Sequence, residues 1–249
     1  MTNTFIITSK IEFAKLIGRL KNRVLLILIM LVSLAASLFS SGGLSIQIAG
    51  MNFNFYNGAF LVLSALNSIV LPMIIFTMSA DIIAHEFSDQ TIKAGLLRPV
   101  SKSTLFLSKW TAIVMFGICC LCISFIFGGL ISVILGQVGF FAALTSYIVS
   151  VLPMCVFAAM SALVATIISS PAMSMFISIV AYLIFSGTSL ISSFLGVIFF
   201  TAHINWYKMF LSSFSSLPLT NIINIAVMMT AYAILFLSLG NIAFSRKKT

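Results

Sequence analysis

Only a few side chains in this sequence could take part in acid–base, nucleophilic or metal chemistry. Its 249 residues include four acids, two histidines and four cysteines. Cys119 and Cys122 have the CxxC spacing found in some zinc sites, with Cys120 between them and Cys155 further along the chain. No histidine or acid accompanies them in the sequence. We therefore expect all four cysteines to be apolar packing residues and predict no metal site.

The two histidines, His85 and His203, are too far apart in the predicted topology to act together. The sequence contains no HExxH zinc motif, no GxSxG nucleophile elbow and no GxxxxGKS/T phosphate loop. It offers no nucleophile–base set for a membrane hydrolase, and the chain cannot hydrolyse ATP on its own. We predict that it is not an enzyme and binds no cofactor itself, so active transport would draw its energy from a partner.

Most of the acids lie in one connection, residues 81–109, and none lies at mid-depth in a predicted membrane span. A short amphipathic helix is predicted there at about 89–98, and Pro99 would end it. Its apolar edge would comprise Ile92, Leu96 and Leu97. Ser101 or Ser103 can then cap the next helix. An apolar edge held crosswise between two membrane spans is a surface that a partner could bury.

The elements that must position this connection are membrane helices. Hydrophobic residues make up 61% of the chain and charged residues 7%, whereas soluble domains have about 45–50% and about 25%. This excludes a soluble enzyme, a disordered chain and, despite the net charge of +9, a nucleic-acid-binding domain. Three long runs lack Asp, Glu, Lys and Arg: Val24–Ala80, Trp110–Tyr207 and Met209–Ser245.

Because a spanning helix needs about 20 apolar residues, we predict an all-α integral membrane protein with six transmembrane helices in a single domain over residues 1–249. The spans are expected near 24–42, 59–86, 104–135, 142–168, 172–195 and 219–243. A β-barrel is disfavoured, because its strands alternate apolar and polar residues. Every Lys and Arg except Lys208 falls in segments that six spans place on one side. The positive-inside rule then predicts cytoplasmic N- and C-termini.

The connections outside the spans have distinct characters. An interfacial amphipathic helix is predicted at about 5–22. Its apolar face would comprise Phe13, Leu16, Ile17 and Leu20. Residues 41–57 are predicted to form an uncharged outer loop, and tight turns are expected at 136–139 and 169–171. The aromatic stretch 196–218 is predicted to be re-entrant, dipping back into the outer leaflet; a plain extension of the fifth span is the alternative.

The charged connection resembles the signature of ABC-2-type permeases, the membrane subunits of bacterial ABC exporters, which include the bacitracin- and lantibiotic-resistance type and exporters of toxin peptides. The residues that carry the resemblance are Glu86, Phe87, Thr91, Ile92, Lys93, Leu96, Leu97, Arg98 and Pro99, followed by Val100, Ser101 and Lys102 and by Lys109, which opens the next span. Lys102 departs from the family pattern, in which Arg is commoner, so the charge is kept but bidentate pairing is lost.

The resemblance implies that Thr91 to Leu97 is a coupling helix that docks on a separate ABC ATPase subunit, which would bind ATP and magnesium. Glu86 would lie beneath the membrane and pair with Lys15, Arg19 or Arg23 of the interfacial helix. A structural ion pair and a role in gating are both open for Glu86. A second permease subunit, identical or not, is also implied, since these exporters use two permeases.

The resulting functional hypothesis is a permease of the bacterial inner membrane that exports an amphipathic peptide, antibiotic or lipid-like substrate by alternating access. Such a protein could confer antimicrobial resistance or secrete a toxin peptide. Side chains of the second and fifth spans are candidates for the pathway: Asn67, Thr77, Ser178, Tyr182 and Ser186. The alternative is an ATP-independent channel or carrier for a hydrophobic solute, which would need no ATPase partner.

Overall fold

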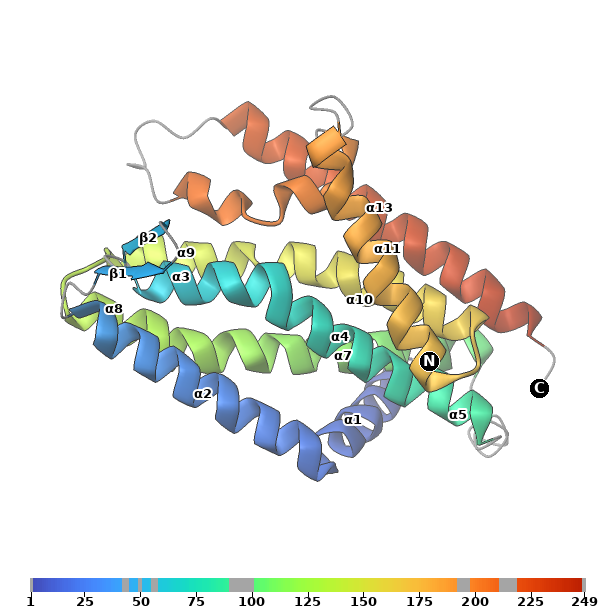
Figure 1. Ribbon diagram of the computed structural model, residues 1–249. Helices are drawn as coiled ribbons and strands as arrows, with labels where there is room; N and C mark the ends of the chain where they lie inside the picture. Colours follow the sequence, from blue (N-terminus) through green and yellow to red (C-terminus); the bar gives the residue numbers. More distant parts are fainter. Residues whose placement is uncertain are drawn as a thin grey trace.

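The computed structural model describes residues 2–41, 45–48, 51–54, 58–89, 101–191, 198–210 and 219–247. Nearly all of these residues are helical, and most helices run side by side in an elongated bundle (Figure 1). In chain order the α-helices are α1 (Thr2–Gly18), α2 (Leu20–Ser41), α3 (Gly58–Ala65), α4 (Leu71–Ser79), α5 (His85–Ser88), α7 (Lys102–Ser124), α8 (Leu130–Ile134), α9 (Phe140–Val149), α10 (Val151–Ile167), α11 (Pro171–Ile191) and α13 (Leu219–Arg246).

Among the described residues, five helical segments are long and apolar enough to cross a membrane. They are Leu20–Leu38, Val62–Ser88, Lys102–Ile134, Phe140–Ile167 and Thr220–Arg246. The fifth predicted span corresponds to α11, whose apolar described stretch, Pro171–Gly187, is shorter. The structure thus contains several apolar helices of membrane-spanning length, and the count of six transmembrane helices stays a prediction.

Three of the joints between helices are π-helical turns, which are wider than α-helical ones. They connect α3 to α4 (Leu66–Val70), α4 to α5 (Ala80–Ala84) and α7 to α8 (Phe125–Gly129). Such turns occur mostly as single insertions within α-helices, frequently at functional sites. Because of them the second and third spans continue from one end of the bundle to the other with local changes of helix phase rather than breaks.

Pro72 lies at the start of α4 and has no backbone N–H to donate to the carbonyl of Ser68, four residues earlier. The hydroxyl of Tyr182, on α11, donates to that carbonyl instead. In the membrane interior a carbonyl without a partner is costly, so this side chain restores what the proline removes. The contact joins α11 to the second span at the proline.

Helix α10 is central, with α13, α4, α7 and α11 packed around it. The chain bends just before it, at Ser150, and Pro153 falls in the first turn of α10, where a missing N–H is tolerated. Two buried polar contacts fasten this part of the chain to the second span. The amide of Asn67 donates to the Ser150 hydroxyl at 2.8 Å, and the Ser79 and Ser161 hydroxyls lie 2.6 Å apart.

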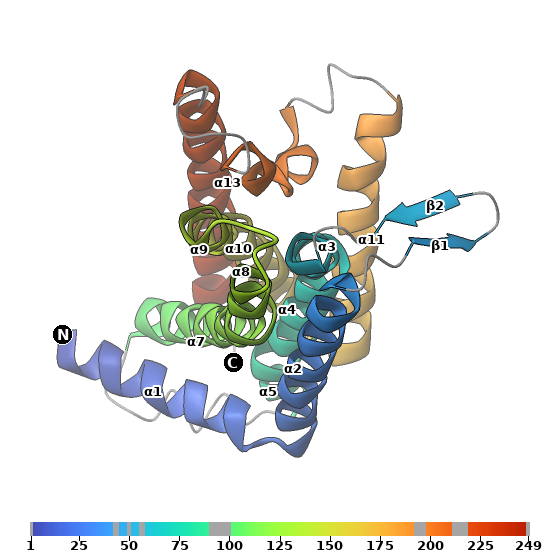
Figure 2. The same ribbon diagram turned by 90° about the vertical axis from the view of Figure 1, so that its left-hand side faces the viewer.

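Helix α1 runs across one end of the bundle (Figure 2). This end also holds α5, the beginning of α7 and the last turn of α13 (Figure 1), and it contains most of the charged side chains; we call it the charged end. Helices α2 and α13 each expose a row of large apolar residues, Leu31 and Ile234 among them, as expected of helices that face lipid.

One expectation from the sequence, that for Leu20, is wrong, and one predicted loop contains strands. The predicted loop at 41–57 contains a short antiparallel hairpin of β1 (Ser45–Ile48) and β2 (Met51–Asn54), while nearly all of the rest of the described chain is helical, as predicted. The alternation of apolar and polar residues in both stretches is typical of strands. Leu20 does not belong to the apolar face of the interfacial helix; it is 77% exposed, because α1 ends at Gly18 and Leu20 begins α2.

Candidate functional site at the charged end

Lys109 is the centre of an ion network at the charged end. Its side chain has no exposed surface, and its Nζ lies 2.6 Å from Oε2 of Glu86 and 3.5 Å from Oε2 of Glu12. The same ammonium donates to the carbonyl of Ile82 at 3.2 Å, within the π-helical turn of the second span. A buried ammonium is costly unless it is paired and hydrogen-bonded, and both conditions are met here.

Lys15 completes this network from its exposed side. Its Nζ lies 3.0 Å from Oε1 of Glu12 and 3.4 Å from Oε1 of Glu86. Burial lowers the pKa of Lys15, but the hydrogen bonds and charges of Glu12 and Glu86 outweigh it and raise that pKa above its usual value. Two lysines and two glutamates thus balance, and they join three elements: α1, the second span and α7. We call these four residues the Lys109 network.

A second ion cluster lies at the junction of α1 and α2. Asp81, in the π-helical turn, contacts Nη1 of Arg19 at 3.2 Å and also pairs with Lys21. Arg23 donates instead to the carbonyls of Ile17 and Gly18 at the end of α1. Of the three predicted partners of Glu86, the structure therefore brings only Lys15 to it.

The sequence of α1 explains why it lies here. Leu16 is fully buried against the core, and Phe13 and Ile17 pack against the same cluster. The hydroxyls of Ser9 and Thr111 meet at 3.0 Å, where α1 crosses α7. This apolar face turns Glu12 and Lys15 toward the network.

On its other side, the end of the second span contacts the C-terminal helix. The ring of Phe87 lies 5.5 Å from that of Phe244, and Nζ of Lys247 lies 4.0 Å from the centre of the Phe87 ring. Lys247 also donates to the carbonyl of Thr166 at the end of α10, at 2.6 Å. Burial lowers the pKa of Lys247. Lys102 in turn reaches the last carbonyls of the C-terminal helix, so each lysine caps another helix end.

The predicted coupling residues divide at the edge of the described chain. Glu86 and Phe87 belong to the contacts above, whereas Thr91, Ile92, Lys93, Leu96, Leu97, Arg98 and Pro99 lie outside the described residues. The chain resumes at Ser101, whose hydroxyl accepts the backbone N–H of Thr104 at 3.2 Å, so the predicted cap of α7 is confirmed. The segment 90–100 therefore begins and ends at the charged end.

A model of the ABC-2 family of transporter proteins matches residues 9–186, which include the Lys109 network and the whole charged connection. The chain belongs to the ABC-2 family. Together with its apolar helices, this makes the protein a multi-pass membrane component of a transporter, and membership implies an ABC ATPase subunit as its partner. No curated protein matches the sequence.

The candidate pathway residues of this ABC-2 protein already have contacts. Asn67 is buried against Ser150, and the buried hydroxyl of Ser178 donates within its own helix. Thr77 donates to its own helix and lies near Met175, while Tyr182 holds the Ser68 carbonyl. Ser186 is partly exposed on α11.

Sequence reasoning missed Glu12 and the pairing of Lys109 with Glu86. Glu12 is the only acid before Asp81, in a segment that is otherwise basic, and it is three residues before Lys15. Lys109 lies about two turns inside α7 rather than at the start of the third span. Each is an exception to its surroundings, and such exceptions are the signal that could have singled them out. The prediction of no metal site was made for the cysteines, which do not belong to this network. Within the described chain, no three His, Cys, Asp or Glu residues lie close enough together to hold a metal ion.

Proposed function

We propose that this protein is the permease subunit of a bacterial ABC exporter. The charged end would face the cytoplasm, both termini would lie there, and α11 would be the fifth of six spans. The short 3₁₀ helices Phe200–His203 and Trp206–Phe210 would form part of the outer re-entrant segment. The family match and the concentration of cations at one end support this arrangement.

The observation that carries the proposal is the position of the Lys109 network. Glu86 precedes the segment 90–100 by four residues, and through Lys109 and Lys15 it contacts both α7 and α1. A displacement of this segment would therefore act on three elements at once. Such a joint is what an exporter needs if ATP-driven closure of two ATPase subunits is to tilt the membrane helices.

The partner subunit would bind ATP and Mg²⁺ and would receive the coupling residues Thr91 to Leu97. A second permease, identical or different, would complete the transporter. Helices α2 and α13 offer the largest exposed apolar faces for such contacts or for lipid. The interfacial residues Lys15, Arg19 and Arg23 would hold α1 at the membrane surface.

For the substrate we propose an amphipathic peptide, an antibiotic or a lipid-like molecule, as in the bacitracin- and lantibiotic-resistance type. The support is the composition of the spans, which have hydroxyl and apolar side chains but no acid at mid-depth. A pathway beside α4 and α11, near Thr77, Tyr182 and Ser186, would suit apolar cargo better than ions or sugars.

The decisive experiment is co-purification of the cognate ABC ATPase with the full-length chain. Leu97→Asp puts a charge on the proposed docking edge and is expected to abolish co-purification while membrane insertion is unchanged. Leu97→Met conserves volume and should retain the ATPase. Leu135→Asp, an exposed position at the opposite end of the bundle, should retain it as well.

Retention of the ATPase by Leu97→Asp would contradict the proposed docking helix. Transport that continues in membranes without ATPase or ATP would contradict the exporter itself and favour a passive carrier. A second readout, substrate-stimulated ATP hydrolysis by the reconstituted complex, should be lost in parallel with co-purification.

A further inference from the structure

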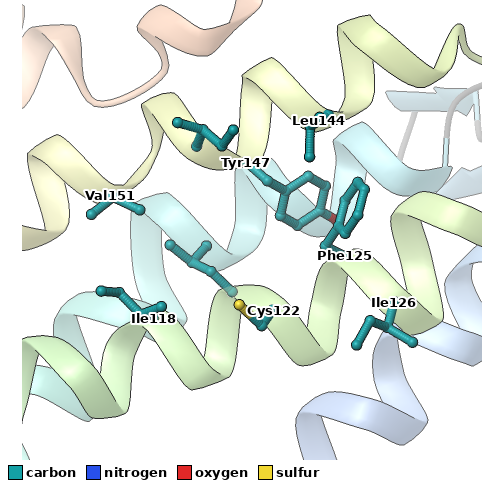
Figure 3. A pocket seen from close by; sticks show the side chains of 9 residues that line it. Ile118, Cys122, Phe125, Ile126, Leu144, Tyr147 and Val151 are labelled. Atoms are coloured by element: carbon teal, nitrogen blue, oxygen red, sulfur yellow. The ribbon is translucent and has the colours of Figure 1, made fainter.

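A cavity of about 270 Å³ lies between the third span and the helix that follows it. One wall is formed by Ile118, Cys122 and Ile126, and the other by Leu144, Tyr147 and Ile148. Figure 3 shows this arrangement, with the Tyr147 ring between the two walls. The lining is apolar apart from the Tyr147 hydroxyl, which is bonded to Ser124 and is not available to a ligand.

The backbone builds this cavity. At one end a Cβ on Gly117 would overlap Met154, so α7 and α10 are in close contact there. At the other end a Cβ on Gly129 would lie 3.2 Å from the Tyr147 ring. The π-helical turn of the third span and the turn at Ser150 interrupt the regular α-helical geometry of the two helices near these contacts. The cavity lies between the two contacts, so the backbone itself forms it.

The cavity opens onto the lipid-facing surface. Ile126 is 49% exposed and Ile148 is 60% exposed, so the rim continues into the apolar exterior of the bundle. At about 1.5 Å per residue the lining residues of the third span, Ile118 to Ile126, begin about 14 Å from Lys109 and reach about 25 Å from it. In a hydrocarbon layer of about 30 Å this places the cavity from the midplane into the leaflet remote from the charged end.

We propose that this cavity binds an acyl chain of a membrane phospholipid from that leaflet. No ionised or free polar group lines it, so it suits a hydrocarbon chain and not a headgroup. None of its residues belongs to α4 or α11, so it is separate from the proposed pathway and from the cargo. Lipid tails are as apolar as the walls, so binding rests on van der Waals packing in a preformed gap rather than on the hydrophobic effect.

The test uses the full-length chain in nanodiscs that contain a fraction of phosphatidylglycerol with a diazirine at the end of one acyl chain. After irradiation, adducts are mapped by peptide mass spectrometry. Adducts are expected to concentrate on residues 118–126 and 144–151, above the level on the exposed face of α13. Cys122→Trp should fill the cavity and reduce these adducts to the α13 level.

Met115→Trp is the matched control, because Met115 is exposed on the same helix but does not line the cavity. It should leave the adduct pattern unchanged. If Cys122→Trp does not give a monodisperse protein, Ile148→Trp fills the cavity from the opposite wall and decides the question. Adducts that merely follow exposure, or that persist in the filled variants, overturn the proposal. A Cys122–Cys122 cross-linked dimer in the wild type would also overturn it, by placing a second copy at the opening.

Discussion

The hydroxyl of Tyr182 donates to the carbonyl of Ser68, at the place in the second span where Pro72 supplies no amide hydrogen. Pro72 leaves the Ser68 carbonyl without an amide donor from its own helix, and Tyr182, on a different helix, supplies the donor. Asn205, from the segment that precedes the last span, approaches the Ser68 hydroxyl at 3.4 Å. Three separate parts of the chain therefore meet at this position of the second span.

Tyr182→Phe is expected to destabilise the protein by about 1 kcal/mol, the usual size of an interhelical hydrogen bond in a membrane. In a Pro72→Ala background the restored amide satisfies the Ser68 carbonyl, and the same substitution should be close to neutral. Unfolding of the four variants in detergent gives the double-mutant cycle. Equal effects of Tyr182→Phe in both backgrounds would show that the two residues are independent.

Glu86→Gln should lower the free energy of unfolding by about 3 kcal/mol, because it leaves the buried Lys109 ammonium with the more distant Glu12 as its one remaining carboxylate partner among the described residues. The measurement is thermal unfolding of the purified protein, followed by tryptophan fluorescence. Asp89→Asn is the control: Asp89 pairs with His85 in an exposed setting, so its loss should change stability by no more than about 0.5 kcal/mol. Equal losses of unfolding free energy in both variants would show that Glu86 stabilises the protein no more than an exposed acid does.

The spans were predictable because a run without charges leaves few alternatives, and Ser101 was predictable because a cap is a local signal. Lys15 was one of three candidate partners of Glu86, but the pairing of Glu86 with Lys109 was not predictable, because helical periodicity defines a face but not the neighbour that covers it. Lys109 meets Glu86 only after α1, the second span and α7 have packed. The π-helical turns and the end of α1 at Gly18 also depend on packing, which explains the error at Leu20.

Gly129→Ala should destabilise the protein by about 2 kcal/mol, because the new methyl would lie 2.8 Å from the Phe125 ring and 3.2 Å from the Tyr147 ring. Gly18→Ala provides the comparison. No atom lies within 4 Å of a Cβ there, so alanine should be neutral or stabilise by up to about 1 kcal/mol. Chemical denaturation of both variants tests this; a tolerated Gly129→Ala would mean that the helices are less closely packed.

Acidification should weaken the outer segment through His203. Burial lowers the pKa of His203 below its ordinary value of 6.5. Because the folded state binds this proton less readily, its contribution to stability is complete above 6.5 and is lost as the pH falls below that value. Unfolding should be compared at about pH 7.5 and about pH 5. The wild type should lose more stability than His203→Gln between these conditions, and equal losses would exclude His203 as the cause.

The reciprocal lysine contacts at the charged end bear on how the protein can be handled. Lys247 is occupied with the end of α10 and the Phe87 ring. A reporter or affinity tag attached close behind Lys247 would lie at the charged end, beside the two ends of the segment 90–100, which we propose as the docking surface. An insertion in the turn at Gly136, at the opposite end of the bundle, would leave these contacts undisturbed.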